Sequence, residues 1–198
     1  MARQFAVTWD YRCPFARNAH EALVKGLQEG RDWDVRFWPF SLDQIHVDEG
    51  QTPVWERDLD DAAAGVSGVR ALLWGIAVRD AFPDHFLDFH VAAFRARHDD
   101  ARKIADESVL REVAAGVGLD PDAVADEVAS GRPLKALEAE HTEAVDRYAV
   151  FGVPTIIDGD EAVFVRMMER GNVDDFAQAL ELVPSVRINE FKRTKIPR

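Results

Sequence analysis

The single cysteine of the chain, Cys13, lies where an apolar segment ends and a helical pattern begins. Pro14 follows it, and proline suits the first helical position because an N–H there would have no partner within the helix. Cys13 is therefore expected at the N-cap, where unpaired backbone N–H groups and the helix dipole favour a thiolate. A dipole contribution of up to about 2 kcal/mol would lower the thiol pKa by about 1.5, and Arg12 and Arg17 are expected to add positive charge. The sequence thus predicts a reactive thiolate.

The segments around Cys13 form a predicted β-α-β unit. A strand is predicted at residues 4–8, a helix from Pro14 to about Gln28, and a strand at 33–40, where apolar and polar residues alternate. A right-handed crossover makes the two strands parallel neighbours. Open α/β sheets keep their sites at the carboxyl ends of strands, so Cys13 is expected at that edge of the sheet.

The middle of the chain, residues 51–149, shows helical periodicity and no convincing strand. Helices are predicted over 61–80, from Pro83, over 109–117, from Pro121 to about 130, and from Pro133 to Tyr148. Gly75 lies inside the first of these, where it either costs about 1 kcal/mol relative to alanine or marks close packing.

The last part returns to β structure. Strands are predicted at 155–157 and 162–165, joined by a hairpin containing Asp158-Gly159, followed by a helix capped by Asn172 that runs through Val183. The tail from Pro184 is basic and is predicted to be solvated or loosely docked, with charges at Lys192, Arg193, Lys195 and Arg198.

This order of elements resembles the DsbA-type branch of the thioredoxin superfamily. The motifs that carry the resemblance are Cys13-Pro14-Phe15-Ala16 after the first strand and Val153-Pro154-Thr155 before the hairpin. The resemblance implies an α/β thioredoxin fold with an all-helical insertion between the second and third strands. It divides the chain into a thioredoxin-like domain of residues 1–52 and 150–198 and an insertion of residues 53–149.

The resemblance also implies roles for individual residues. Pro154 would be cis, and the backbone of Val153 would face a substrate beside the sulfur. The candidate catalytic positions are Cys13, Pro14 and Ala16, and the candidate substrate contacts are Tyr11, Arg12, Phe15, Val153, Pro154 and Thr155. Asp10 and Tyr11 either tune the thiol or serve as loop and capping residues.

Ala16 departs from the family pattern, which has a second cysteine at this position. Without a resolving thiol, Cys13 would form a mixed disulfide with a substrate or small thiol, and an external thiol would release it. This monothiol oxidoreductase is the first hypothesis. The second is a glutathione- or mycothiol-dependent transferase or isomerase, similar to kappa-class glutathione transferases and 2-hydroxychromene-2-carboxylate isomerases, in which Cys13 holds the sulfur of a bound thiol. The third is a binding protein without catalysis.

Composition and residue spacing limit the expected partners, location and cofactors of the protein. The net charge of −12 argues against a nucleic-acid groove and an anionic membrane surface. The sequence shows no leader pattern and no run of about 18 apolar residues, and a lone cysteine fits a reducing compartment. A cytoplasmic protein is therefore expected. Its Arg-rich composition indicates a bacterial source. The spacing of the histidines does not favour a metal site. No tightly bound cofactor is expected, and glutathione or mycothiol is the expected co-substrate. A homodimer remains open.

Overall fold

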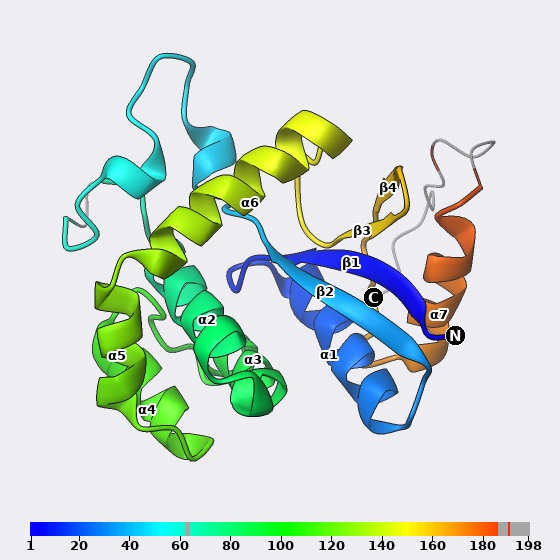
Figure 1. The fold of residues 1–198 in the computed structure, drawn as a ribbon, viewed down its shortest axis with the longest axis horizontal. Coiled ribbons are helices and arrows are strands. Elements are labelled where there is room, and N and C mark those ends of the chain that lie inside the picture. The colour runs from blue at the N-terminus through cyan, green and yellow to red at the C-terminus, as the bar shows by residue number, and fades with distance from the viewer. Residues whose placement is uncertain (62–63, 186–189, 191–198) are drawn as a thin grey trace.

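The computed structural model describes residues 1–61, 64–185 and 190. Its sheet has the strand order β2-β1-β3-β4 (Figure 1). The strands are β1 (Arg3–Trp9), β2 (Trp33–Pro39), β3 (Thr155–Asp158) and β4 (Glu161–Phe164). β1 and β2 pair in parallel, as predicted, whereas β3 is antiparallel to both β1 and β4. The basic residues predicted to form a solvated tail, from Lys192 to Arg198, lie outside the described residues.

Helices make up the elements described between β2 and β3, in agreement with the predicted insertion. They are α2 (Val69–Ala81), α3 (Pro83–His98), α4 (Glu107–Gly116), α5 (Pro121–Ala129) and α6 (Arg132–Tyr148), with short 3-10 turns at Gln44–His46 and Val54–Glu56. Outside the insertion, α1 (Pro14–Gln28) follows β1 and α7 (Val173–Leu182) follows β4. Most predicted elements are therefore confirmed to within two residues.

The first helix of the insertion begins later than predicted, at Val69 rather than near residue 61. Gly65 has a φ of 68°, which a helix cannot accommodate. Gly68 donates its N–H to the Asp43 carboxylate over 2.8 Å, so the helix starts only after this contact. The apolar pattern continues through this loop because Val66 is buried there as well.

The two faces of the sheet are covered by different helices. Phe37 of β2 packs on His20 of α1, with ring centroids 5.9 Å apart. Its neighbour Trp38 points the other way and donates its indole N–H to the Glu140 carbonyl of α6 over 2.8 Å. Figure 1 accordingly shows α1 and α6 on opposite sides of β1 and β2.

A buried chain of polar groups connects β1, α1 and α3. The Tyr11 hydroxyl lies 2.9 Å from His90 Nδ1, His90 Nε2 lies 3.0 Å from His20 Nδ1, and His20 Nε2 lies 3.1 Å from the Thr8 carbonyl. All four residues are fully buried. A carbonyl oxygen only accepts, so His20 Nε2 carries a proton, and neutral rings then make His90 Nε2 and the Tyr11 hydroxyl the next donors. All three hydrogen bonds of this network are therefore donated in the direction from Tyr11 toward Thr8.

This network fixes Tyr11 in the core and corrects its assignment as a substrate contact. Tyr11 has no exposed surface, and its hydroxyl is used by His90. A Cβ atom on Gly75 of α2 would lie 2.5 Å from the Tyr11 hydroxyl oxygen, which confirms that this glycine marks close packing. His98 fixes the same loop by donating from Nε2 to the Tyr11 carbonyl over 2.9 Å.

Burial of neutral histidines predicts acid sensitivity. Burial lowers the pKa of both His20 and His141 from 6.5 to about 4, and the pKa of His90 falls for the same reason. The unfolded chain therefore binds more protons than the native chain between these values, and stability falls as the pH drops from about 6.5 toward 4. His141→Asn keeps an acceptor for the Ser41 N–H, which now bonds to His141 Nδ1. We expect this substitution to reduce the slope of the unfolding free energy against pH, below pH 6.5, by up to about 1.4 kcal/mol per pH unit.

Urea unfolding at several pH values measures this slope. Exposed His46 offers a matched control, because His46→Asn removes a histidine without removing a buried one. Equal slopes for wild type and His141→Asn would contradict the assignment of His141 as a buried neutral group.

The contact between Gly75 and Tyr11 predicts coupled effects on stability. We expect Gly75→Ala to cost about 1–3 kcal/mol through overpacking. We expect Tyr11→Phe to cost a similar amount, because it leaves a buried acceptor on His90 unpaired. The double variant should lose less than the sum of both, since the hydroxyl is the atom nearest the new methyl group. Urea unfolding tests this, with Gly116→Ala as the control, since Gly116 is the last residue of α4 and a Cβ added there meets open space. A Gly75→Ala protein as stable as Gly116→Ala would disprove the packing argument.

Candidate active site

Cys13 is the N-cap of α1, as the sequence predicted. Its backbone is extended, Pro14 occupies the first turn of the helix, and its sulfur accepts the Ala16 N–H over 3.4 Å. The turn that leads to it is closed by the Cys13 N–H, which donates to the Asp10 carbonyl over 3.1 Å. The sulfur is thus held at the carboxyl end of β1, and the chain has no second thiol near it or elsewhere.

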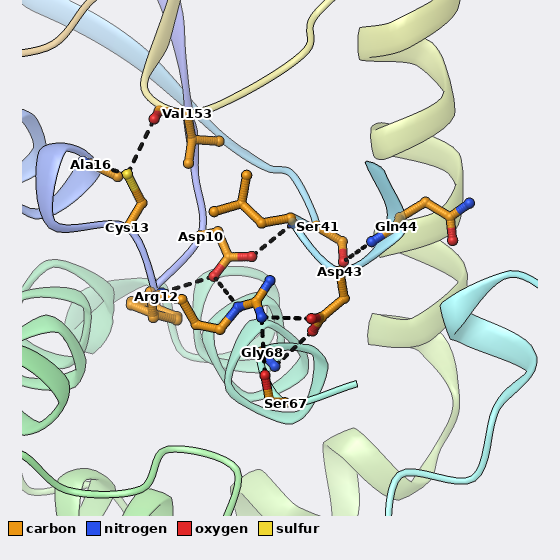
Figure 2. Close-up of polar contacts among 12 residues, drawn as sticks. Asp10, Arg12, Cys13, Ala16, Ser41, Asp43, Gln44, Ser67, Gly68 and Val153 are labelled. Atoms are coloured by element: carbon orange, nitrogen blue, oxygen red, sulfur yellow. Dashed lines mark hydrogen bonds and ion pairs between the residues drawn. The ribbon is translucent and has the colours of Figure 1, made fainter. Parts of the chain in front are cut away.

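The loop before β3 faces the same sulfur. The Cys13 S–H donates to the Val153 carbonyl over 3.3 Å, as Figure 2 shows. The Val153–Pro154 peptide bond is cis. Pro154 is held from the other side by the Val165 N–H, which donates to its carbonyl over 3.0 Å. The structure therefore brings Cys13, Pro14, Phe15 and Ala16 together with Val153 and Pro154.

Thr155 is a structural residue rather than a substrate contact, which corrects its assignment. It is buried, its hydroxyl donates to the Gly152 carbonyl over 2.8 Å, and its N–H donates to the Thr8 hydroxyl over 2.9 Å. These bonds use the polar groups that a substrate would need. They attach β3 to β1 beneath the Val153 carbonyl.

The prediction of a lowered thiol pKa is wrong. Burial of the half-buried sulfur raises the pKa of Cys13, and this effect exceeds the lowering by the N–H groups of Ala16 and Phe15. Asp10 raises it further, whereas Arg166 lowers it. The Val153 carbonyl acts in the same direction as burial, because it bonds to the protonated form and faces the thiolate with a lone pair. The resting state of this site is a neutral thiol.

Arg12 and Arg17 do not supply free positive charge to the sulfur. Arg12 Nη1 forms an ion pair with Asp43 at 2.6 Å, and its Nε lies 3.7 Å from Asp10. Arg17 pairs with Asp99 at 2.6 Å. The guanidinium of Arg12 is paired with carboxylates but stays partly exposed, and its role as a substrate contact stays a prediction.

Asp10, Arg12 and Asp43 form an acidic cluster with one shared cation, as Figure 2 shows. The Asp10 carboxylate has no exposed surface and accepts the N–H groups of Arg12 and Leu42 over 2.8 and 2.9 Å. Burial raises the pKa of Asp10, and Arg12 and the two N–H donors lower it less. Because Asp43 also accepts from Gly68, the cluster joins the Cys13 loop to the start of α2.

Sequence reasoning missed an aromatic and cationic group beside the cysteine. The Arg166 guanidinium carbon lies 5.4 Å from the Phe15 ring centre and 5.7 Å from that of Phe164. Phe151, which is 66% exposed, packs against Phe164 with centroids 5.1 Å apart. The alternation of strand residues would have placed Phe164 and Arg166 on one face, but nothing local indicated that Phe15 lies opposite.

The raised pKa of Cys13 predicts slow alkylation at neutral pH. Since Cys13 is the only cysteine, iodoacetamide incorporation measured by mass against pH reports on it alone. We expect a midpoint above about 8.5, the value of an unperturbed thiol. Asp10→Asn should lower the midpoint because it removes a negative charge that raises the Cys13 pKa.

Asp34→Asn, at the opposite end of β2, controls for loss of an acidic residue and should leave the midpoint unchanged. Thermal unfolding checks that Asp10→Asn remains folded. A wild-type midpoint at or below about 8.5 would refute the neutral resting thiol regardless of the variants.

Comparison with known proteins identifies the family. The sequence model described as "DSBA-like thioredoxin domain" matches residues 80–181, just over half of the 198 residues, although this range does not include Cys13. None of the curated proteins matches the chain. No described helix is long and apolar enough to cross a membrane.

Solved structures share the fold at low sequence identity. DsbA from Pseudomonas aeruginosa is 20% identical with a TM-score of 0.60, covering 93% of this chain and 83% of its own. A probable DsbA oxidoreductase from Streptomyces coelicolor is 20% identical with a TM-score of 0.64, covering 96% and 93%. A 2-hydroxychromene-2-carboxylate isomerase is 17% identical with a TM-score of 0.64, covering 93% and 96%. The fold is thus a thioredoxin fold with a helical insertion, and the chain belongs to the DSBA-like thioredoxin domain family.

Proposed function

We propose that this protein is an oxidoreductase- or isomerase-type enzyme that works with an external low-molecular-weight thiol, and that Cys13 holds the sulfur of that thiol. The observation that supports it is the state of Cys13, a neutral thiol whose S–H donates to the Val153 carbonyl. A protonated thiol is a hydrogen-bond donor and a poor nucleophile. It suits a site that stabilises the thiolate of a bound molecule better than one that attacks by itself.

The start of α1 supplies the remaining groups for this role. A sulfur placed beside Cys13 would receive its S–H and would lie near the N–H groups of Phe15 and Ala16, which now act on Cys13. Hydrogen bonds to a charged acceptor, together with the positive end of the helix dipole, lower the pKa of that second thiol. The bound thiolate is then the nucleophile toward an electrophilic or isomerisable substrate. Glutathione and mycothiol are both thiols of this kind.

Monothiol exchange is the second candidate, favoured by the partial exposure of the sulfur and its Ala16 N–H donor. In this cycle the Cys13 thiolate attacks a substrate disulfide, forms a mixed disulfide and releases one substrate thiol. A low-molecular-weight thiolate then attacks the mixed disulfide and releases Cys13. Ala16 cannot take part in the release, because its side chain is a buried methyl group. The low thiolate fraction at neutral pH makes this cycle slower than in a site with a lowered pKa.

A matched pair of variants separates the two candidates. Cys13→Ser keeps a donor in place of the S–H, whereas Cys13→Ala removes it. If Cys13 holds a bound thiolate, glutathione- or mycothiol-dependent conjugation of chlorodinitrobenzene should survive in Cys13→Ser and fall about 10- to 100-fold in Cys13→Ala. Reduction of hydroxyethyl disulfide and intact mass after incubation with oxidised glutathione report on exchange.

The outcomes are distinct. Equal loss of activity in both variants, with a mixed disulfide on the wild type, would establish monothiol exchange in place of the proposed role. If the wild type neither binds glutathione or mycothiol nor turns over either substrate, the proposal fails.

A further inference from the structure

Arg166 occupies a defined position beside Cys13 and Phe15. It follows β4, whose last residue Phe164 pairs with Thr155 of β3. The residue between them, Val165, bonds to the Pro154 carbonyl. Arg166 therefore comes directly after the backbone contact that holds the Val153–Pro154 loop against Cys13. Its guanidinium lies near the rings of both Phe15 and Phe164, at 5.4 and 5.7 Å.

The charge of Arg166 is not compensated by an ion pair within the described part of the chain. Arg12 and Arg17, which flank Cys13 in the sequence, are paired with Asp43 and Asp99. Arg166 instead has only aromatic neighbours among its described contacts, and it is exposed. Its positive charge lies beside the thiol of a protein whose net charge is −12.

Two features prepare this guanidinium for a ligand. The Phe15 and Phe164 rings restrict its motion, so less side-chain entropy is lost when an anion binds. The planar fork of an arginine also matches a carboxylate, which it can bind through two parallel hydrogen bonds. The guanidinium lies near the ring of Phe15, the second residue after Cys13, and its charge acts on the Cys13 sulfur. A molecule whose sulfur lies at Cys13 can therefore present a carboxylate to Arg166.

We propose that Arg166 binds a carboxylate of the thiol that works with Cys13, so that the site selects carboxylate-bearing thiols over neutral ones. This inference rests on the proposed function and adds the chemical class of the thiol. Glutathione carries two carboxylates and belongs to the selected class. Mycothiol, a thiol whose cysteine is amide-linked to an uncharged sugar unit, has no free carboxylate and belongs to the disfavoured class.

Calorimetric titration of four protein and ligand combinations tests the contact. Reduced glutathione and its diethyl ester, in which both carboxylates are neutral, are titrated into the wild type and into Arg166→Gln. We expect Arg166→Gln to weaken glutathione binding about tenfold and to leave binding of the diethyl ester unchanged. The wild type should bind the ester about as weakly as Arg166→Gln binds glutathione.

Arg31→Gln is the control for loss of a positive charge. Arg31 is also an exposed arginine near an aromatic ring, 6.0 Å from the Trp33 centroid, but it is paired with Asp174 at 2.9 Å and lies before β2 at the opposite end of the sheet. Its loss should leave glutathione affinity unchanged, which separates a local contact from a general effect of net charge. The ester titration needs no variant and remains informative if Arg166→Gln is unstable.

The remaining outcomes overturn the inference in recognisable ways. If Arg166→Gln weakens glutathione and its ester equally, or weakens neither, Arg166 does not bind the carboxylate. If the wild type binds mycothiol more tightly than glutathione and Arg166→Gln changes neither affinity, the inference fails while the proposed function stands. If the wild type binds no thiol at all, the proposed function itself fails.

Discussion

The buried carboxylate of Asp10 holds together the parts of the chain that make the site. It accepts N–H groups from the loop after β1 and from the loop after β2, and it lies near the guanidinium of Arg12. A buried carboxylate is costly to leave unpaired, so each of these contacts is strongly favoured once the others exist. Through Arg12 and Asp43 the same cluster reaches Gly68 at the start of the insertion. The position of Cys13 is thus determined by groups from both parts of the fold.

This arrangement explains why the cysteine is not the reactive thiolate that its helix position alone favours. The N-cap supplies donors, but the surrounding fold buries the sulfur, places the Val153 carbonyl against it and puts the charge of Asp10 nearby. Burial, the carbonyl and Asp10 all favour the neutral thiol. In a protein with a second cysteine such a thiol would still have an internal partner, whereas here Ala16 leaves it only external ones.

Much of the fold could be predicted from the sequence because its signals are local. The proline after Cys13, the Asp120-Pro121 pair and the Asp158-Gly159 turn each set their own backbone conformation, and the structure confirms α1, α5 and the β3–β4 hairpin. The chemistry of the site was less predictable because it depends on distant residues. Whether Arg12 is free depends on Asp43, and whether Tyr11 is accessible depends on His90 and Gly75.

The buried chain from Tyr11 through His90 and His20 to Thr8 also determines how protons can reach the site. A proton relay needs groups that accept a proton at one end while releasing one at the other, but this chain ends on a backbone carbonyl that stays unprotonated. Both imidazoles are held neutral, and no step along the chain can start without charging one of them in the core. The network therefore holds Tyr11 in place at the loop that carries Cys13, and it does not serve as a path for protons to the sulfur.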